Sequence, residues 1–384
     1  MVAAVRRGLP LRAVARQFRV PLATVQHWVR RAAGRRLDRV DWNDRPRIPR
    51  HTHRTPTAVE DLVLDLRRQL RDHSDLGLVG AEAIREELQR RGVTPLPSVR
   101  TIGRILVRRG ALDARRRVRR PAPPPGWYLP DLARRRGELD SFDVVEGLVL
   151  ADGPRVEVLN GVSLHGGLVV SWPQAAALTA KGVVNDLIEH WRAWGLPDYA
   201  QFDNDTLFHG PSRYADTVGR VIRLCLSLGV VPVFVPPRET GFQAAIEGYN
   251  GWWQAKVWSR FHHADLEQLQ GRSNRFVDAY RRRRAARIEA APGRRTFPVA
   301  WRLNLQAPLC GRLVYLRRTD GRGRADVLGH SFAVSPQWPG RLVRAEVDLS
   351  RGRIRFYALR RRAPTDQPLL AEVAYQLPQR RFQE

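Results

Sequence analysis

Residues 142–172 read FDVVEGLVLADGPRVEVLNGVSLHGGLVVSW and carry the pattern that decides the fold. Three runs rich in valine and leucine are separated by Asp-Gly and Gly-Gly turns, which is typical of an antiparallel meander of strands. Helix and strand patterns then alternate, with helices expected at 181–194, 215–228 and 241–262 and strands at 197–202 and 230–235. This order predicts an α/β core at residues 136–292, a mixed sheet with helices on its faces.

Three carboxylates stand within or beside these elements. Asp143 lies in the first strand, Asp203 follows the strand at 197–202, and Glu247 lies on the expected helix at 241–262. Two strands and a helix can bring such side chains to one point, and carboxylate oxygens are ligands that Mg²⁺ prefers. Two divalent ions held together can stabilise the attacking and leaving oxygens of a phosphodiester. The constellation therefore predicts a two-metal phosphoryl-transfer site.

The charge of the chain points to a polyanionic partner. Its 384 residues include 66 basic and 38 acidic side chains, a formal net charge of +28, and all the basic residues except Lys181 and Lys256 are arginines. Arginine contacts phosphate and guanine edges with two parallel hydrogen bonds, so double-stranded DNA is the expected partner.

Composition also argues against other classes of protein. The only two cysteines, Cys225 and Cys310, have no partner at metal-ligand spacing, which disfavours a zinc site or a disulfide framework. We see no membrane-spanning stretch and no signal peptide, so we expect a cytoplasmic bacterial protein associated with the nucleoid and not with a membrane.

The N-terminal residues 1–35 carry a helix-turn-helix pattern. Apolar residues in LRAVARQFRVPLATVQHWVRR, residues 11–31, fall at helical spacing on both sides of a break at 19–21. The second helix would present polar side chains to the major groove, namely Gln26, His27, Arg30 and Arg31. A purely structural helical hairpin is the alternative.

A second helix-turn-helix is expected at residues 57–113. Helical patterns cover 57–73 and 80–91, and Ser98 is placed to cap a third helix that would expose Arg100, Thr101 and Arg104 to DNA. A polar linker at 36–56 precedes this unit. A basic, proline-rich linker at 114–135 follows it, and we expect that linker to cross the DNA backbone.

The C-terminal residues 306–384 read as strands separated by frequent turn signals. This pattern predicts a small β-barrel whose many arginines grip DNA phosphates.

Taken together, these motifs resemble those of DDE transposases of the bacterial insertion-sequence type, in the retroviral-integrase superfamily. FDVVEGLVLADG resembles the first catalytic strand, QFDNDTLF the second, and PPRETGFQAAIEGYN the start of the catalytic helix. The resemblance implies a ribonuclease H-like catalytic core in which Asp143, Asp203 and Glu247 hold two Mg²⁺ or Mn²⁺ ions. It further implies hydrolysis and strand transfer on element ends and target DNA by a homo-oligomer, and it leaves open whether an accessory ATPase takes part.

The sequence departs from the family pattern at three positions. Asp205 stands where the family has glycine, and Ala245 and Gly248 stand where basic residues flank the glutamate. A catalytically decayed or domesticated DNA-binding protein that retains the fold is therefore the alternative. Glu239 is nearer the usual spacing than Glu247, but it follows two prolines and has no helical context, so we expect Glu247 to act.

Two further residues on the Glu247 helix are predicted to touch DNA. Asn250 lies one helical turn after Glu247, and Lys256 lies further along the same expected helix.

Overall fold

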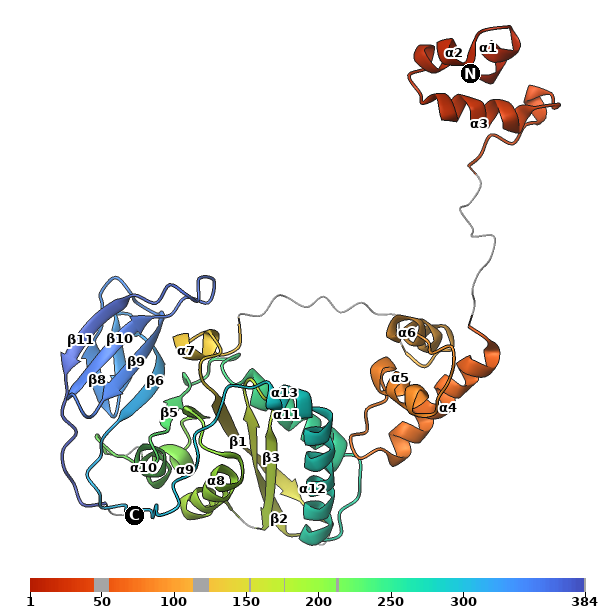
Figure 1. Cartoon of the computed structure of the whole chain (residues 1–384). Helices are drawn as coiled ribbons and strands as arrows, with labels where there is room; N and C mark the ends of the chain where they lie inside the picture. The colour runs from red at the N-terminus through yellow and green to blue at the C-terminus, as the bar shows by residue number, and fades with distance from the viewer. Residues whose placement is uncertain (45–54, 113–123, 152, 176, 212–213, 383–384) are drawn as a thin grey trace. The chain divides into compact units, whose positions relative to one another are not determined.

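The computed structural model describes residues 1–44, 55–112, 124–151, 153–175, 177–211 and 214–382. The chain divides into two compact units, Met1–Thr57 and Ala58–Glu384, and each is described by itself (Figure 1). In these described ranges no helix combines the length and the apolar character needed to cross a membrane.

The first unit consists of short helices around a small core. These are α1 (Val2–Arg6), α2 (Leu11–Gln17), α3 (Leu22–Ala32) and a 3₁₀ turn at Leu37–Arg39. Val14 and Val25 are fully buried and join α2 to α3. Val40 is buried against Ala32, and the Trp28 and Trp42 rings lie 5.7 Å apart.

The predicted linker at 36–56 is therefore partly wrong, because its first residues belong to this core. Residues 45–54 of that linker lie outside the described residues.

The second unit begins with three helices, α4 (Thr57–His73), α5 (Ala81–Arg90) and α6 (Val99–Arg108). The Ser98 Oγ accepts a hydrogen bond from the Thr101 N–H at 3.1 Å and so caps α6, as its position predicted. The helices share one apolar cluster of Val63, Leu66, Ile84, Leu88, Ile102, Ile105 and Leu106.

The predicted basic linker at 114–135 is also shorter than expected. Trp127, Tyr128 and Leu129 are buried against the sheet, and α7 (Pro130–Ala133) follows them. The Arg344 guanidinium donates to the Tyr128 carbonyl at 2.8 Å. Aromatic residues after a proline run thus anchor the chain to the core, and the part of the linker up to residue 123 lies outside the described residues.

The core is a nine-stranded mixed sheet in the order β11-β10-β9-β6-β5-β4-β1-β2-β3. Its meander consists of β1 (Leu139–Val149), β2 (Arg155–Ser163) and β3 (Val169–Ala175), paired antiparallel as the sequence predicted. The strands β4 (Tyr199–Phe202) and β5 (Val231–Phe234) run parallel to β1. This order is consistent with the ribonuclease H-like core that the sequence predicted.

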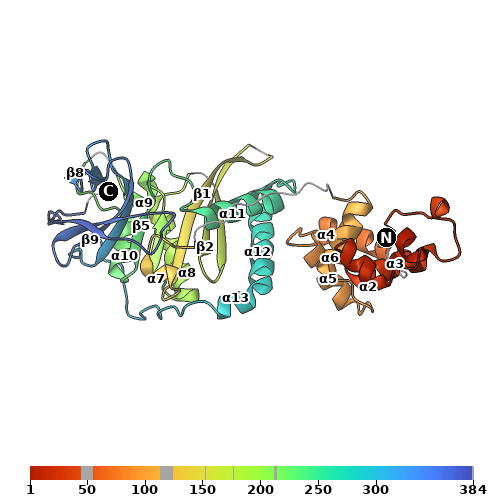
Figure 2. The ribbon, with the colours of Figure 1, turned by 90° about the horizontal axis from the view of Figure 1, so that it is seen from above.

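Helices cover both faces of the meander, and Figure 2 shows α8 and α12 on opposite sides of it. The helices are α8 (Ala180–Trp194), α9 (Thr206–His209), α10 (Arg220–Ser227), α11 (Ala244–Trp253), α12 (Leu266–Arg283) and α13 (Ala285–Glu289). Phe142 packs with α8, whereas its neighbour on the other face, Val145, packs with α11 and α12. The predicted helix at 241–262 is interrupted, because a π-helix at Gln254–Trp258 follows α11.

The C-terminal strands differ from the separate barrel that the sequence suggested. Four of them continue the core sheet: β6 (Arg312–Arg318), β9 (Leu342–Asp348), β10 (Arg353–Ala358) and β11 (Leu369–Ala374). The joint is β6, which pairs in parallel with β5 at Val314 and Tyr315. Its LVYL run, 313–316, is buried on both faces, which is typical of a strand inside a sheet that is covered on both sides. The strands β7 (Arg324–Val327) and β8 (His330–Ala333) form a separate two-stranded ladder.

Candidate active site

Asp143 lies near the middle of β1, the first strand of the meander. Its Cα partner on β2 is Asn160, and the preceding pair is Phe142 with Gly161. Gly161 has to lack a side chain, because a Cβ there would lie 2.6 Å from the Phe142 ring. Burial raises the pKa of Asp143 to about 6, and the negative charges of Asp203 and Glu247 add to that effect.

Asp203 comes directly after β4, at the edge of the sheet where the parallel strands end. Its Oδ1 accepts a hydrogen bond from the Asp205 N–H at 3.0 Å, and the Asn204 Nδ2 ties the loop to the Val235 carbonyl at 2.6 Å. Burial raises the pKa of Asp203, and the nearby charge of Asp205 raises it further. Both aspartates are thus held in surroundings that disfavour their negative charge.

Glu247 lies in the first turn of α11 and is exposed. It lines a cavity of about 560 Å³ together with Asp203, Asp205, Glu239 and the proline loop 236–237. The cavity therefore joins the end of β4 to the start of α11.

The fit of these carboxylates to a divalent cation is incomplete as they stand. Within the described part of the chain, no group of three or more His, Cys, Asp or Glu side chains is placed to hold a metal ion. The donor chemistry nevertheless suits Mg²⁺, since all three side chains are carboxylates. Burial, and then the charges of Asp203 and Glu247, raise the pKa of Asp143, and a bound cation would offset both effects. Glu247 is exposed, and exposed side chains change rotamer within nanoseconds, so its carboxylate is free to reorient.

Asn250 does not lie where a DNA contact would. It is buried, its Nδ2 donates to the Asp143 Oδ2 at 2.7 Å, and its Oδ1 accepts from the Asn160 Nδ2 at 2.8 Å. The prediction of a DNA contact was wrong, because α11 turns this residue towards the sheet while Glu247 faces outwards. Asn250 instead fixes the orientation of the Asp143 carboxylate.

Lys256 is likewise engaged inside the protein. Its Nζ donates to the Gly77 carbonyl at 3.0 Å, and the Arg260 guanidinium donates to the Arg71 carbonyl at 2.7 Å. These contacts join the segment after α11 to the last turn of α4 and to the turn between α4 and α5. The structure therefore does not support a DNA contact by Lys256.

Glu239 lines the same cavity, but two guanidiniums compensate its charge. The Arg318 Nε donates to its Oε1 at 2.6 Å, and an Arg361 nitrogen lies 3.5 Å from its Oε2. A carboxylate already paired in this way is a poorer cation ligand than exposed Glu247, which favours the expected choice.

Local contacts explain one of the three departures from the family pattern, Asp205. Asp205 is the N-cap of α9, where its Oδ1 accepts from the Leu207 N–H at 2.7 Å, a contact that glycine cannot make. Ala245 packs at the edge of the α11–α12 apolar cluster, and open space surrounds Gly248. Asp205 therefore has a structural role beside the site.

Sequence reasoning missed a second aspartate of β1. Asp140 is buried and accepts hydrogen bonds from Arg294 and from the Trp191 Nε1 at 3.1 Å, with the His190 Nε2 3.4 Å away. Burial alone would raise its pKa, but the charge of Arg294 and the contact with His190 outweigh burial and lower the pKa to about 2. The apolar residue spacing around Asp140 gave no signal for this pairing with a residue far along the chain.

The predicted recognition residues of α3 divide into two groups. Gln26, His27 and Arg30 are exposed, as a DNA contact requires. Arg31 pairs with Asp41 at 3.2 Å, and its guanidinium lies 5.0 Å from the Trp28 ring centroid. Arg31 therefore helps to hold the segment after α3, which differs from the predicted DNA contact.

The predicted residues of α6 divide in the same way. Arg100 and Arg104 are exposed. The Thr101 hydroxyl lies 2.9 Å from the Ser98 Oγ, within the N-terminal cap of α6. Thr101 thus contributes to the start of the helix rather than to an open surface.

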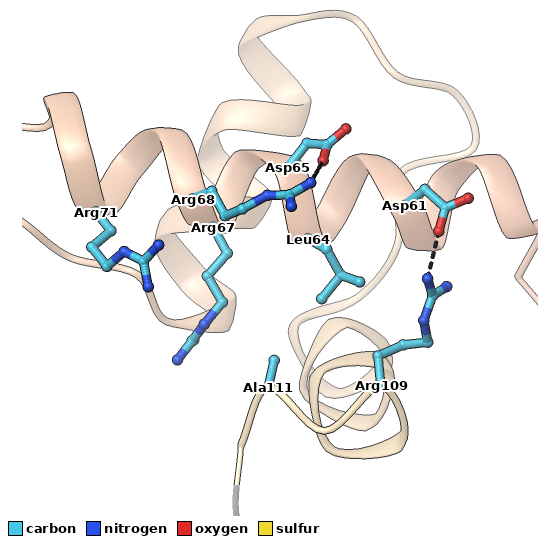
Figure 3. A pocket seen from close by; sticks show the side chains of 8 residues that line it. All are labelled: Asp61, Leu64, Asp65, Arg67, Arg68, Arg71, Arg109 and Ala111. Carbon is cyan, nitrogen blue, oxygen red and sulfur yellow. Dashed lines mark hydrogen bonds and ion pairs between the residues drawn. The ribbon is translucent and has the colours of Figure 1, made fainter.

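A second cavity of about 560 Å³ lies between α4 and the end of α6 (Figure 3). Four arginines line it, but each has a partner. Arg109 pairs with Asp61 at 2.6 Å and Arg67 donates to the Val79 carbonyl at 2.7 Å. Arg68 pairs with Asp65 and Arg71 with Asp72. Compensated charges of this kind make the cavity a weaker candidate than the carboxylate edge of the sheet.

Comparisons with known proteins give structural likenesses only. A scan against protein-family models finds no match, and a search of curated proteins finds none. The catalytic core domain of BIV integrase is similar at 17% identity and a TM-score of 0.26, covering 37% of this chain and 80% of that one.

An intasome of simian T-cell lymphotropic virus, in complex with the PP2A regulatory subunit B56 gamma, is similar at 13% identity and a TM-score of 0.32. That likeness covers 79% of this chain and 95% of the other. At these TM-scores neither likeness carries weight for function, which has to follow from the residues of this chain.

Proposed function

We propose that the chain is a DDE-type DNA transposase of the bacterial insertion-sequence type, on an integrase-like ribonuclease H fold. It binds element-end DNA and catalyses phosphodiester hydrolysis and strand transfer. The observation that carries this proposal is that Asp203 and Glu247 line one cavity and that the charges of both act on Asp143 of the neighbouring strand. Burial raises the pKa of Asp143, and the negative charges of Asp203 and Glu247 raise it further, which supports a functional role for this carboxylate.

These three carboxylates would hold two Mg²⁺ or Mn²⁺ ions. When bound, such ions make water or a 3′-hydroxyl a better nucleophile and stabilise the leaving oxygen. The chain itself orients the carboxylates: Asn250 donates to Asp143, and the Asp205 N–H donates to Asp203. Holding ligands in place by a second layer of hydrogen bonds sharpens their geometry.

DNA recognition falls to the two helical regions. Exposed Gln26, His27 and Arg30 on α3, and Arg100 and Arg104 on α6, suit base edges and phosphates in the major groove. The net charge of +28 suits a long DNA contact. Because two element ends have to be joined to one target, we expect the protein to act as a homo-oligomer on DNA.

The test is a strand cleavage and transfer assay on duplex DNA carrying the element ends, with Mg²⁺ present. Glu247→Gln should lose activity by several orders of magnitude while binding DNA as the wild type does. The matched control is Glu146→Gln, which removes the same charge from an exposed position on β1 and should stay active. Equal activity in the two variants would remove Glu247 from the site.

One observation favours a second candidate, a decayed DNA-binding protein that retains the fold. No trio of acidic side chains in the described ranges is placed to hold an ion. Calorimetric titration of Mn²⁺ into the full chain separates the two candidates. The transposase should bind Mn²⁺ through Asp143, and the decayed protein should bind DNA without binding the metal.

A further inference from the structure

Two arginines hold an acidic residue of the cavity that Asp203 and Glu247 line. Arg318 is the last residue of β6, and Arg361 lies in the loop after β10, so both come from the C-terminal extension of the sheet. Both guanidiniums converge on Glu239, which lines the cavity together with Asp203 and Glu247. A carboxylate between two guanidiniums occupies the place that another anion with paired oxygens could take.

Other contacts keep the two guanidiniums in position without Glu239. An Arg361 nitrogen donates to the Thr240 carbonyl at 2.8 Å, and its guanidinium lies 5.1 Å from the Phe242 ring centroid. Arg318 also donates to the Gly340 carbonyl. These contacts do not involve Glu239, so both guanidiniums can keep them when the Glu239 carboxylate turns away.

The ion pairs of Glu239 with these two arginines are accessible to solvent. The side chains of Arg318 and Arg361 are 49% and 44% exposed, and Glu239 is 20% exposed. Ion pairs this open to water contribute little free energy, so an incoming anion can replace one partner. A phosphodiester makes stronger paired hydrogen bonds with arginine than water does.

We propose that Arg318 and Arg361 form a binding subsite for a DNA backbone phosphate next to the bond to be cut, and that Glu239 occupies this subsite until DNA displaces it. The proposal rests on the proposed function, because the cavity has to receive a DNA strand. Glu239 thus acts as an internal competitor, and the C-terminal strands contribute directly to substrate binding at the carboxylate edge.

The test measures the affinity of the full chain for a labelled DNA duplex by fluorescence anisotropy, without divalent ions. Glu239→Gln removes the competing charge and should raise the affinity about two- to fivefold, the range that an exposed ion pair is worth. Arg318→Gln and Arg361→Gln should lower the affinity roughly three- to tenfold. In a double Arg318→Gln/Arg361→Gln background, Glu239→Gln relieves repulsion but restores no phosphate contact, so the affinity should stay below that of the wild type.

Matched controls are available in the same strands. Glu372 is also held by two arginines, Arg353 at 3.1 Å and Arg355 at 2.9 Å, but it does not line the cavity. Arg360 neighbours Arg361 and pairs with Asp366. Glu372→Gln and Arg360→Gln should therefore change the affinity much less than their counterparts at the cavity.

Several results would overturn the subsite. These are weaker DNA binding by Glu239→Gln, an equal gain in Glu372→Gln, or wild-type affinity in the variant that lacks Glu239 and both arginines. If inorganic phosphate stabilises the wild type through Arg318 while duplex affinity is the same in Arg318→Gln, the subsite serves free anions and not DNA. Should Glu239→Gln melt far below the wild type, Glu239→Ala replaces it, because alanine also removes the competing charge, and an affinity no higher than that of the wild type then overturns the proposal.

Failure of the subsite differs from failure of the proposed function. A wild type that binds no duplex contradicts DNA binding altogether, and a wild type that binds but does not cleave points to the decayed protein. Neither outcome resembles a wild type that binds and cleaves DNA but is indifferent to the charge at position 239.

Discussion

Asp140 and Asp143 lie three residues apart on the same strand, and their surroundings differ in kind. Asp140 faces Arg294, His190 and Trp191, which lower its pKa to about 2. Burial and the charges of two further carboxylates raise the pKa of Asp143 to about 6. A hydrogen bond from the Asn250 amide partly offsets this effect. A buried carboxylate with cationic partners stabilises a fold, whereas one left among like charges is suited to bind a cation.

We expect the largest loss of stability from a substitution of Asp140. Asp140→Ala leaves the partly buried Arg294 without its carboxylate partner and should lower the free energy of unfolding by roughly 3 kcal/mol. Denaturant unfolding measures the loss. Asp143→Ala is the control, since it removes repulsion and should cost far less. A smaller loss at Asp140 than at Asp143 would reverse the comparison.

The pH dependence of stability should separate the same residues. The folded pKa of Asp140, about 2, lies below its ordinary value of 3.8, so the stabilisation of about 2 kcal/mol is complete above pH 3.8. It is lost as the pH falls through 2. The difference in unfolding free energy between wild type and Asp140→Asn should therefore shrink over that window. A difference that does not change between pH 5 and pH 2 would show that Asp140 is not held as an anion.

Asn250 donates the side-chain hydrogen bond that orients the Asp143 carboxylate, so its removal tests how far activity depends on that orientation. Asn250→Ala should lower the strand-transfer rate about 10- to 100-fold, the usual cost of removing a group that orients a metal ligand. DNA affinity and KM for the duplex should stay near the wild-type values, and raised Mn²⁺ should recover part of the rate. A fall in DNA affinity without a fall in the strand-transfer rate would instead support the predicted DNA contact of Asn250.

The arginines of α3 also differ in whether an acidic side chain pairs with them. Arg30 is exposed, whereas Arg31 pairs with Asp41. Arg30→Ala should cost roughly 1–3 kcal/mol on element-end DNA and less on DNA of arbitrary sequence. Arg31→Ala should mainly lower the melting temperature of this unit. Footprinting and thermal melting of both variants provide the measurement.

Sequence reasoning predicted the elements around the site because their signals are local. The valine and leucine runs of β1 to β3 alternate between two buried faces, and Ser98 caps α6 where the apolar spacing begins. The positions of Asp143, Asp203 and Glu247 on these elements followed from the same patterns.

The features that sequence reasoning missed depend on contacts between distant parts of the chain. The rotation of α11 that buries Asn250 is set by its packing on the sheet, and the pairing of β6 with β5 joins segments about 80 residues apart. No spacing rule links Asp140 to Arg294, or Glu239 to Arg318 and Arg361. Several arginines that the sequence predicted to bind DNA phosphates form ion pairs with acidic side chains of the protein instead.

We infer that strand transfer depends on Asp143, the carboxylate of β1 that is kept among like charges. This dependence is tested most directly by comparing Asp143→Asn with the wild type in a strand-transfer assay, with duplex binding measured on the same preparations. The variant keeps the size of the side chain and an oxygen that can accept from Asn250, so it should fold and bind DNA as the wild type does. We predict that it transfers no strands. Transfer at the wild-type rate with intact DNA binding would contradict the account.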